Sequence, residues 1–171
     1  MIRLKAPFMN IEQLNAGDKV MISGLLYVAR DQAHKRMVEQ FEKYHTFPVD
    51  IRDMGIYYAG PCPSKPGQVI GSIGPTTSGR MDKYAPVLLD NGLKIMIGKG
   101  NRDKNVIESM IKNKAVYIGV TGGIGALISK CITSQKIIAY DELGAEALRE
   151  IYVEDFPGIV IIDAKGHNLY D

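Results

Sequence analysis

The sequence predicts an α/β fold in a single domain, built on a mixed sheet. Three observations lead to this prediction. The chain has 171 residues, which is enough for one domain with a substantial core. From residue 31 onward, apolar runs of strand length alternate with segments of helical periodicity. The early strand signals look like a hairpin, which favours a sheet that is not purely parallel.

The first strand signal covers residues 18–30, DKVMISGLLYVAR, and predicts one strand or two strands broken at Gly24. The next segment, 31–44, has apolar side chains at helical spacing, with Asp31 as the expected N-cap. Residues 56–63 then predict a short strand that two prolines stop.

Further along, the segment GPTTSGRMD at 74–82 lies between an apolar run and a helical pattern. That helix is expected to end at Asn91-Gly92. The other expected elements are strands at 69–74, 93–98, 115–120, 136–140 and 158–163, a helix at 105–114, a glycine loop with a short helix at 121–130, and a loop with a short helix at 141–151.

Composition limits the possible classes of function. The net charge of 21 − 19 = +2 gives no indication of nucleic-acid binding. No apolar run approaches the roughly 20 residues that span a bilayer, and the N-terminus lacks an apolar export segment, so we expect a cytoplasmic protein. Cys62 and Cys131 fit neither a disulfide framework nor a zinc spacing. We therefore expect both cysteines to be structural or incidental and the chain to hold no metal.

Three loops that follow strands and open helices could carry chemistry: residues 29–36, 74–82 and 98–102. Each offers a cation close to a helix start, namely Arg30, Arg80 or Lys99. Helix N-termini attract anions, and the guanidinium group of arginine matches a carboxylate with two hydrogen bonds. If the three loops converge, they would hold a small molecule with two anionic groups.

Each of these residues also has a simpler interpretation. Arg30 and Lys99 could be ordinary surface residues, and His34 could be an exposed residue in the first turn of a helix. The three hydroxyls could be plain helix caps: Thr76, Thr77 and Ser78. The same arrangement of a strand, a cation and a helix start occurs three times within 102 residues, and this favours the functional interpretation.

Two phosphate-binding motifs are only partly matched. Gly74 and Gly79 have the separation found in a P-loop, but Arg80 and Met81 stand where the motif requires Lys and Ser or Thr. The glycines at 121–126 do not fit the dinucleotide-binding register, and we expect them to allow close backbone approach. Nucleotide binding is therefore not expected.

The segments GPTTSGRMDKY, GKGNR, ARDQAHKR and YYAGPCP together resemble the C-terminal catalytic domain of the iron–sulfur hydro-lyases, the class I fumarases and tartrate dehydratases. The resemblance spans nearly all of residues 1–171, including the tail ELGAEALREIYVEDFPGIVIIDAKGHNLY. It implies a swivelling β/β/α domain, which in some members follows a larger domain and in others is a separate beta subunit.

The resemblance also implies the reaction and the partner. The reaction is reversible addition of water across the double bond of a dicarboxylate. The cofactor is a [4Fe–4S] cluster held by three cysteines of the other domain, or of an alpha subunit, and this chain has only two cysteines. We expect a hetero-oligomer with that alpha subunit, or a homodimer when the chain is isolated.

Site residues follow from the positions that match the family's motifs. The resemblance implies catalytic roles for three residues: Thr76, His34 and Lys99. It implies substrate binding by four more: Arg30, Arg80, Thr77 and Ser78. Positive charge from Arg80 and Lys99 would stabilise the substrate carboxylate while a neighbouring C–H loses its proton. The identity of the base stays open between Thr76 and a carboxylate of the other subunit, and His34 could be an acid or an orienting residue.

Substrate choice depends on small differences from the tartrate enzymes. Gly79 and the pair Asn101-Arg102 are present here and favour malate and fumarate. Tartrate and mesaconate remain alternatives, since rejecting one methyl group is worth only about 1–3 kcal/mol. An alternative of another class is an anion-binding module without activity. Arg102 lies at the edge of its loop and is expected to tolerate alanine better than Arg80 does.

Overall fold

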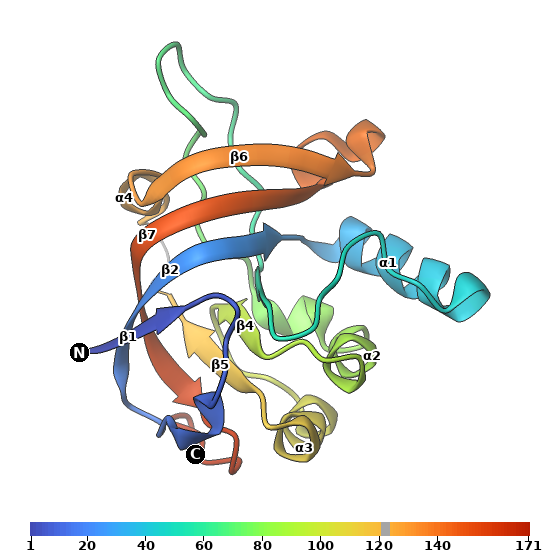
Figure 1. Ribbon diagram of the computed structural model, residues 1–171, viewed down its shortest axis with the longest axis vertical. Coiled ribbons are helices and arrows are strands. Elements are labelled where there is room, and N and C mark those ends of the chain that lie inside the picture. The colour runs from blue at the N-terminus through green and yellow to red at the C-terminus, as the bar shows by residue number, and fades with distance from the viewer. Residues whose placement is uncertain (121–123) are drawn as a thin grey trace.

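A computed structural model describes residues 1–120 and 124–171 (Figure 1). Its strands are β1 (Ile2–Lys5), β2 (Lys19–Val28), β3 (Gly55–Tyr57), β4 (Ile95–Gly98), β5 (Val116–Gly119), β6 (Ile132–Ala139) and β7 (Leu148–Ile162). Its α-helices are α1 (Asp31–Tyr44), α2 (Ala85–Asp90), α3 (Lys104–Asn113) and α4 (Gly125–Ser129). Its 3₁₀ helices are η1 (Ile11–Gln13), η2 (Ser78–Met81) and η3 (Asp141–Glu146). In the described parts, no helix is long and apolar enough to cross a membrane.

The strands form one mixed sheet in the order β1-β2-β3-β4-β5-β7-β6. The pairings from β1 through β5 are parallel, whereas β7 runs antiparallel to both β5 and β2. Because β7 also pairs with β2, the strands β2, β3, β4, β5 and β7 close into a barrel. The predicted α/β class and the predicted mixed sheet are therefore confirmed.

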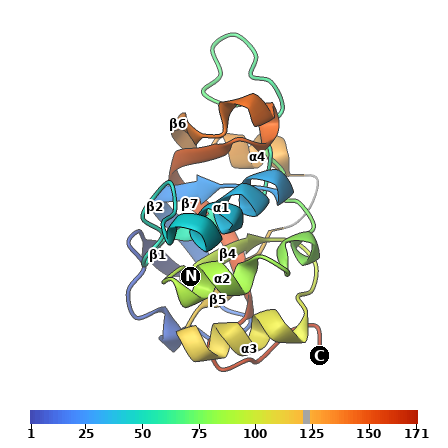
Figure 2. The same ribbon diagram turned by 90° about the vertical axis from the view of Figure 1, so that its right-hand side faces the viewer.

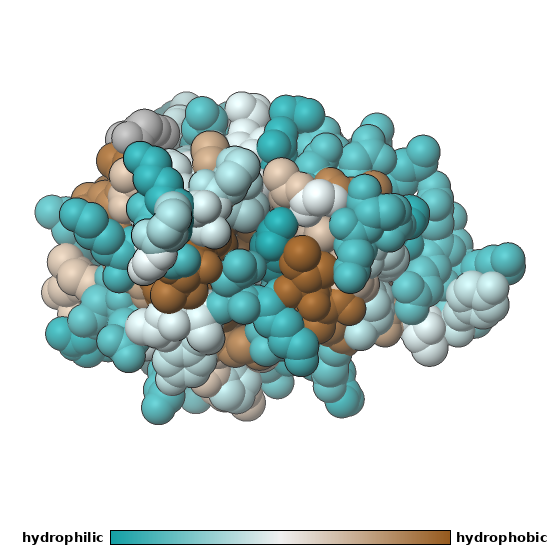
Figure 3. Space-filling view, turned by 90° about the horizontal axis from the view of Figure 1, so that it is seen from above, coloured by the Kyte–Doolittle hydropathy of each residue, from teal (hydrophilic) through white to brown (hydrophobic). Residues whose placement is uncertain are grey.

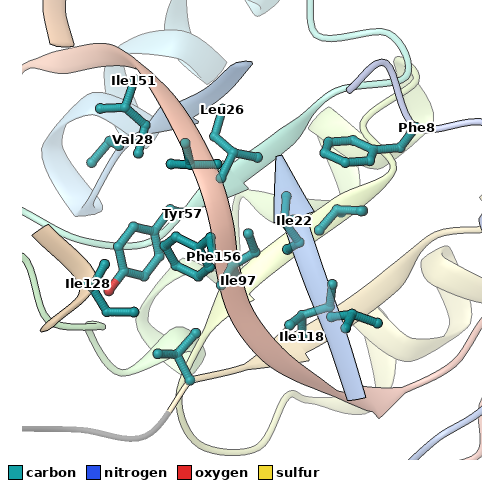
Figure 4. Packing of buried hydrophobic residues seen from close by; sticks show 14 of the residues in the cluster. Phe8, Ile22, Leu26, Val28, Tyr57, Ile97, Ile118, Ile128, Ile151 and Phe156 are labelled. Carbon is teal, nitrogen blue, oxygen red and sulfur yellow. The ribbon is translucent and has the colours of Figure 1, made fainter. Parts of the chain in front are cut away.

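Two apolar cores hold the barrel and its helices together. The first lies inside the barrel, where the rings of Tyr57 and Phe156 meet edge to face at 5.0 Å between their centroids (Figure 4). The second lies between the sheet and α1, α2 and α3, which cover one side of the molecule (Figure 2). Each core buries side chains from the parallel strands, so the two cores fix those strands from both faces.

Several predicted elements formed close to their expected positions. α1 matches the segment 31–44, although Arg30 takes the N-cap position and Asp31 is the first helical residue. β2 is one strand, with a bulge at Gly24 where an added Cβ would lie 3.1 Å from the Cβ of Ala6. α3 begins at the N-cap Asp103, whose carboxylate accepts a 2.9 Å hydrogen bond from the amide of Val106.

Three parts of the predicted pattern were wrong. Residues 69–74 form no strand, because Ile70 and Ile73 are buried in the first core from an irregular segment. Residues 141–151 divide into η3 and the start of β7, which is 15 residues long and absorbs the predicted strand at 158–163. β1 was not predicted, because it is only four residues long and three of those residues are exposed. Part of the predicted glycine loop, 121–123, lies outside the described residues.

Candidate functional site

The parallel strands β2, β3 and β4 end at one edge of the sheet. Val28 is paired with Tyr57, and Tyr57 with Ile97, so the residues that follow these three strands emerge side by side. The ladder continues beyond the strands, since the amide of Ala29 donates to the carbonyl of Tyr57 and the amide of Tyr58 donates to that of Ile97. Carboxyl ends of parallel strands are where α/β proteins usually build sites.

The segment 75–78 lies between the ends of β3 and β4. The amide of Thr76 donates to the carbonyl of Tyr58 at 2.7 Å, and the amide of Ser78 donates to the carbonyl of Lys99 at 2.9 Å. Thr77 and Lys99 also form an isolated parallel bridge. These bonds bring the threonine loop and the lysine loop together, which is the condition under which the sequence analysis expected a shared anion site.

Ser78 is the residue that anchors this segment from within. It is fully buried, and its hydroxyl lies 2.8 Å from the phenol of Tyr117, which donates to the carbonyl of Gly100. Gly98 makes room for it, because a Cβ there would lie 2.1 Å from the Ser78 Oγ. In this geometry the Ser78 hydroxyl is used within the protein, so its predicted substrate contact has no support from its position.

Thr76, Thr77, Arg80 and Lys99 lie closer to solvent. Thr76 is half-buried, and the other three are exposed. Thr77 takes the N-cap position of η2 but makes no side-chain capping bond. The alternative that Thr77 is a helix cap is therefore not supported, and its hydroxyl can bind another group.

The Arg80 guanidinium is held by Asp31 at the first position of α1. Its Nε and its Nη2 both lie 2.9 Å from the Asp31 Oδ2, while half of the Arg80 side chain remains exposed. The loop at 74–82 is thus tied to the start of α1, and Arg80 keeps other N–H groups for a ligand. Sequence reasoning missed Asp31 as a site residue. An acid in the first turn of a helix, next to a candidate arginine, was the available signal.

His34 and Arg30 lie at the same helix start, but only Arg30 reaches the surface. Arg30 is half-buried, and a Cβ at Gly60 would lie 2.8 Å from the Arg30 Cδ, so this glycine lets the arginine lie flat against the backbone. His34 is fully buried, and its Nδ1 lies 2.8 Å from the Arg30 carbonyl oxygen, which makes Nδ1 the protonated nitrogen. Its Nε2 is buried without a hydrogen-bond partner.

The surroundings of His34 keep it neutral. Its ring packs edge to face with Tyr58, with centroids 5.3 Å apart, and stacks on Tyr84 at 6.2 Å. Burial lowers the pKa of His34 to about 4 and outweighs the hydrogen bond to the Arg30 carbonyl. The sequence alternative of an exposed histidine is wrong. Both the catalytic role and the orienting role of His34 stay predictions.

Arg102 occupies a very different place from the loop edge that the sequence predicted. Its side chain is fully buried, and its Nε donates to the Asp82 Oδ1 at 2.7 Å. The guanidinium carbon lies 5.2 Å from the ring centroid of Tyr58 and 5.0 Å from that of Tyr117. Asp82 also accepts a 2.9 Å bond from the amide of Asp103. Arg102 therefore joins the loops at 78–82 and 99–103.

The chain's own cysteines do not fit a four-iron cluster. Cys62 and Cys131 are both free thiols, and three thiolates are needed for a cluster with one open iron. Within residues 1–120 and 124–171, no three side chains of His, Cys, Asp or Glu gather as metal ligands. The candidate site is thus a surface of cations and hydroxyls.

We expect Arg102→Ala to destabilise the protein by about 3–5 kcal/mol, because it leaves the mostly buried Asp82 carboxylate, with 11% of its side chain exposed, without its partner. The measurement is the free energy of unfolding from urea denaturation. Arg52→Ala is the matched control, since Arg52 pairs with Asp50 on the surface and its loss should leave stability nearly unchanged. Equal effects of the two variants would contradict the structural role of Arg102.

The low pKa of buried His34 predicts that the stability of the protein depends on pH. Its pKa is about 4 in the folded protein against 6.5 ordinarily, so the unfolded chain binds more protons between these values. The contribution of neutral His34 to the free energy of unfolding is therefore fully present above pH 6.5. It falls by up to about 3 kcal/mol as the pH drops to 4.

The check for this prediction is urea denaturation at several pH values in three proteins. His34→Gln should lose stability less steeply below pH 6.5 than the unmodified chain, and His45→Gln, at an exposed position, should follow the unmodified chain. Identical pH profiles for all three proteins would show that His34 does not titrate as argued.

Comparison with known proteins identifies relatives along the whole chain. "Fumarate hydratase 2" of Leishmania major is 40% identical over 162 residues, covering 94% of this chain and 28% of that protein. "Fumarate hydratase class I, aerobic" of Escherichia coli strain K12 is 37% identical, covering 98% of this chain and 31% of that protein. The chain thus spans less than a third of the length of either fumarate hydratase.

A relative of similar length also exists. "Putative L(+)-tartrate dehydratase subunit beta" of Methanocaldococcus jannaschii is 33% identical over 168 residues, covering 95% of this chain and 86% of that protein. The family model described as "Fumarase C-terminus" matches residues 2–171. With a match over nearly its full length, the chain belongs to the fumarase C-terminal domain family.

Proposed function

We propose that this chain supplies the dicarboxylate-binding half of a hydro-lyase that interconverts (S)-malate and fumarate. The observation that carries the proposal is the meeting of the 75–80 segment with Lys99 and the start of α1 at one edge of the sheet. The edge presents Arg30, Arg80 and Lys99, three cations suited to a doubly charged anion. The relatives named as fumarate hydratases support the reaction.

The residues of this chain would act on the carboxylates and on one proton. Arg80, oriented by Asp31, would bind one substrate carboxylate through its free N–H groups. Removal of a proton from the carbon beside a carboxylate pushes negative charge onto that carboxylate, and Arg80 and Lys99 would stabilise this charge. Thr76 is the hydroxyl that we place at this proton, with Thr77 beside it as a further hydrogen-bond donor. A threonine hydroxyl needs an activating base.

The remainder of the site would come from another domain or an alpha subunit. The relatives named as fumarate hydratases are more than three times as long as the region matched, and the tartrate dehydratase relative is named as a subunit. We propose that the partner carries the three cysteines and the [4Fe–4S] cluster, since the two cysteines here do not suffice. The exposure of Thr77, Arg80 and Lys99 is consistent with a site that a second surface completes.

Tartrate is the second candidate substrate, because the relative with matching length is named as a tartrate dehydratase subunit. Asn101 bears on this choice indirectly. Its Oδ1 accepts from the amide of Arg102 at 2.8 Å and from the Asn168 side chain at 3.1 Å. Asn101 and Arg102 therefore fix the shape of the Lys99 loop, and any preference for malate would act through that shape.

The proposal is tested by co-producing the chain with a candidate alpha region under anaerobic conditions and assaying malate, tartrate and citramalate. We expect a stable complex that dehydrates malate fastest, and an isolated chain that is inactive. Fastest turnover of tartrate would assign the second candidate. A complex without activity on any of the three acids would contradict the proposal and favour an anion-binding module. Activity of the isolated chain would contradict the proposal as well.

Within that complex, Asp31→Asn should lower kcat/KM for malate by about 10–100-fold, mainly through a higher KM. The reason is that Arg80 loses the charged group that fixes its orientation, and misplacement on the order of 1 Å is worth about 100-fold. Steady-state kinetics measure the effect.

Glu142→Gln is the matched control for Asp31→Asn, because it removes an ion pair with Arg36, which lies on the same helix as Asp31 but does not contact Arg80. It should leave both kinetic constants unchanged. If Arg80→Ala abolishes activity but Asp31→Asn leaves kcat and KM unchanged, Asp31 does not position Arg80.

A further inference from the structure

Arg149 is a buried arginine without a counterion in the described residues, and it lies near the same end of the barrel as the candidate site. It belongs to the start of β7 and is paired in register with Val28 of β2 and Ile137 of β6. Only 8% of Arg149 is exposed. Its Nη1 donates to the Gln135 Oε1 at 3.3 Å, its Nη2 donates to the Gly144 carbonyl at 2.9 Å, and its Nε has no partner.

The charge of Arg149 is not neutralised within the described residues. The chain has seven arginines, and five of them form ion pairs with carboxylates there: Arg3, Arg36, Arg52, Arg80 and Arg102. For Arg149, no carboxylate of residues 1–120 or 124–171 lies within ion-pairing distance. Its two hydrogen-bond partners are neutral oxygens. A buried cation is costly unless it is paired, so an anion from solution would offset that cost.

A hollow of about 270 Å³ adjoins this arginine. Its walls come from the loop that rises above β6 in Figure 1, from β6 itself and from η3. Its lining includes Arg149, Gln135, Ser64, Pro61, Ile70 and Ala145. The hollow thus combines one cation, two neutral polar side chains and several apolar ones. This is the composition of a site for a small molecule that has an anionic end and a carbon skeleton.

A larger hollow of about 460 Å³ lies on the neighbouring side of the same loop and shares Cys62, Pro63 and Ile70 with the first. It adds two lysines, Lys65 and Lys130. No aspartate or glutamate of the described residues lines either hollow. Seen from above, this end of the molecule shows hydrophobic groups beside hydrophilic ones (Figure 3). The local field here is positive, although the net charge of the chain is only +2.

We infer that the hollow beside Arg149 binds a small organic anion that carries a carboxylate or a phosphate group. The anionic group would pair with Arg149, with Ser64 and Gln135 as hydrogen-bond partners, and the carbon skeleton would pack on Pro61 and Ile70. The site adjoins the catalytic loops but differs from them. A Cβ at Gly60 would lie 2.8 Å from the Arg30 side chain and 3.0 Å from the carbonyl of Ala145 in the hollow wall.

Isothermal titration calorimetry of the chain tests this inference, with succinate and glycerol 3-phosphate as separate probes. We expect one of the two to bind, and Arg149→Gln to weaken that binding more than about tenfold. Arg80→Gln, which alters the proposed catalytic surface, should leave it unchanged. Whichever probe binds more tightly identifies the anionic group.

A second variant guards against misfolding of Arg149→Gln. Ala145→Trp keeps the arginine and fills the hollow from an exposed position on η3, so it should abolish binding while the melting temperature stays the same. Binding that survives both variants but is lost in Arg80→Gln would belong to the catalytic loops and would overturn the inference. Absence of binding by either probe to the unmodified chain would overturn it as well. Neither result depends on whether the complex with an alpha region is active.

Discussion

The candidate site depends on one buried ion pair, between Arg102 and Asp82. Arg102 reaches from the loop after β4 to the segment after η2, and two tyrosine rings, from the end of β3 and from β5, enclose its guanidinium. A charge in this position is tolerated only because the carboxylate, the ring faces and the Tyr58 hydroxyl at 3.3 Å all compensate it. The pair therefore acts as a fixed link, and the Arg80 and Lys99 loops take their relative position from it.

Around that link the site is built in two layers. The inner layer is buried and makes no use of solvent: Ser78, Tyr117, Tyr58, His34 and Arg102. The outer layer presents the groups that can meet a ligand, namely Thr76, Thr77, Arg80 and Lys99. Gly98 marks the boundary, because the absence of a side chain there lets the Ser78 hydroxyl approach β4. The inner layer positions the outer one, as a preorganised site requires.

Sequence reasoning found the outer layer better than the inner one, for a physical reason. Three loops with cations at helix starts follow from periodicity and local chemistry, and the register of β2, β3 and β4 brought these loops to one edge. The burial of Arg102 and His34 follows from packing between segments far apart in sequence, which local patterns do not contain. A tolerant position at the edge of a loop was therefore the natural expectation for Arg102, whereas the structure buries its side chain.

The same limit explains the errors in the fold. β7 extends over 15 residues because it pairs with β2, β5 and β6 along its length, whereas its sequence suggested a short helix and a separate strand. Tertiary pairing there overrides local propensity. The segment 69–74 shows the reverse case, with apolar residues that enter the core without joining the ladder.

The positions of the positively charged residues connect the two proposals, whereas the net charge of the chain does not. A net charge of +2 suggests no anionic ligand, yet the two arginines without a carboxylate partner in the described residues, Arg30 and Arg149, lie at the same end of the barrel. Both have a buried Nε without a hydrogen-bond partner. The Arg30 side chain lies close to Gly60, and so does the carbonyl of Ala145 in η3, the segment that precedes Arg149. The other five arginines form ion pairs with acids of the chain, so the arginines that have no such pair in the described residues lie at one end of the fold. Binding of small anions there would stabilise the folded chain itself, because it supplies the negative charge that the described residues do not provide.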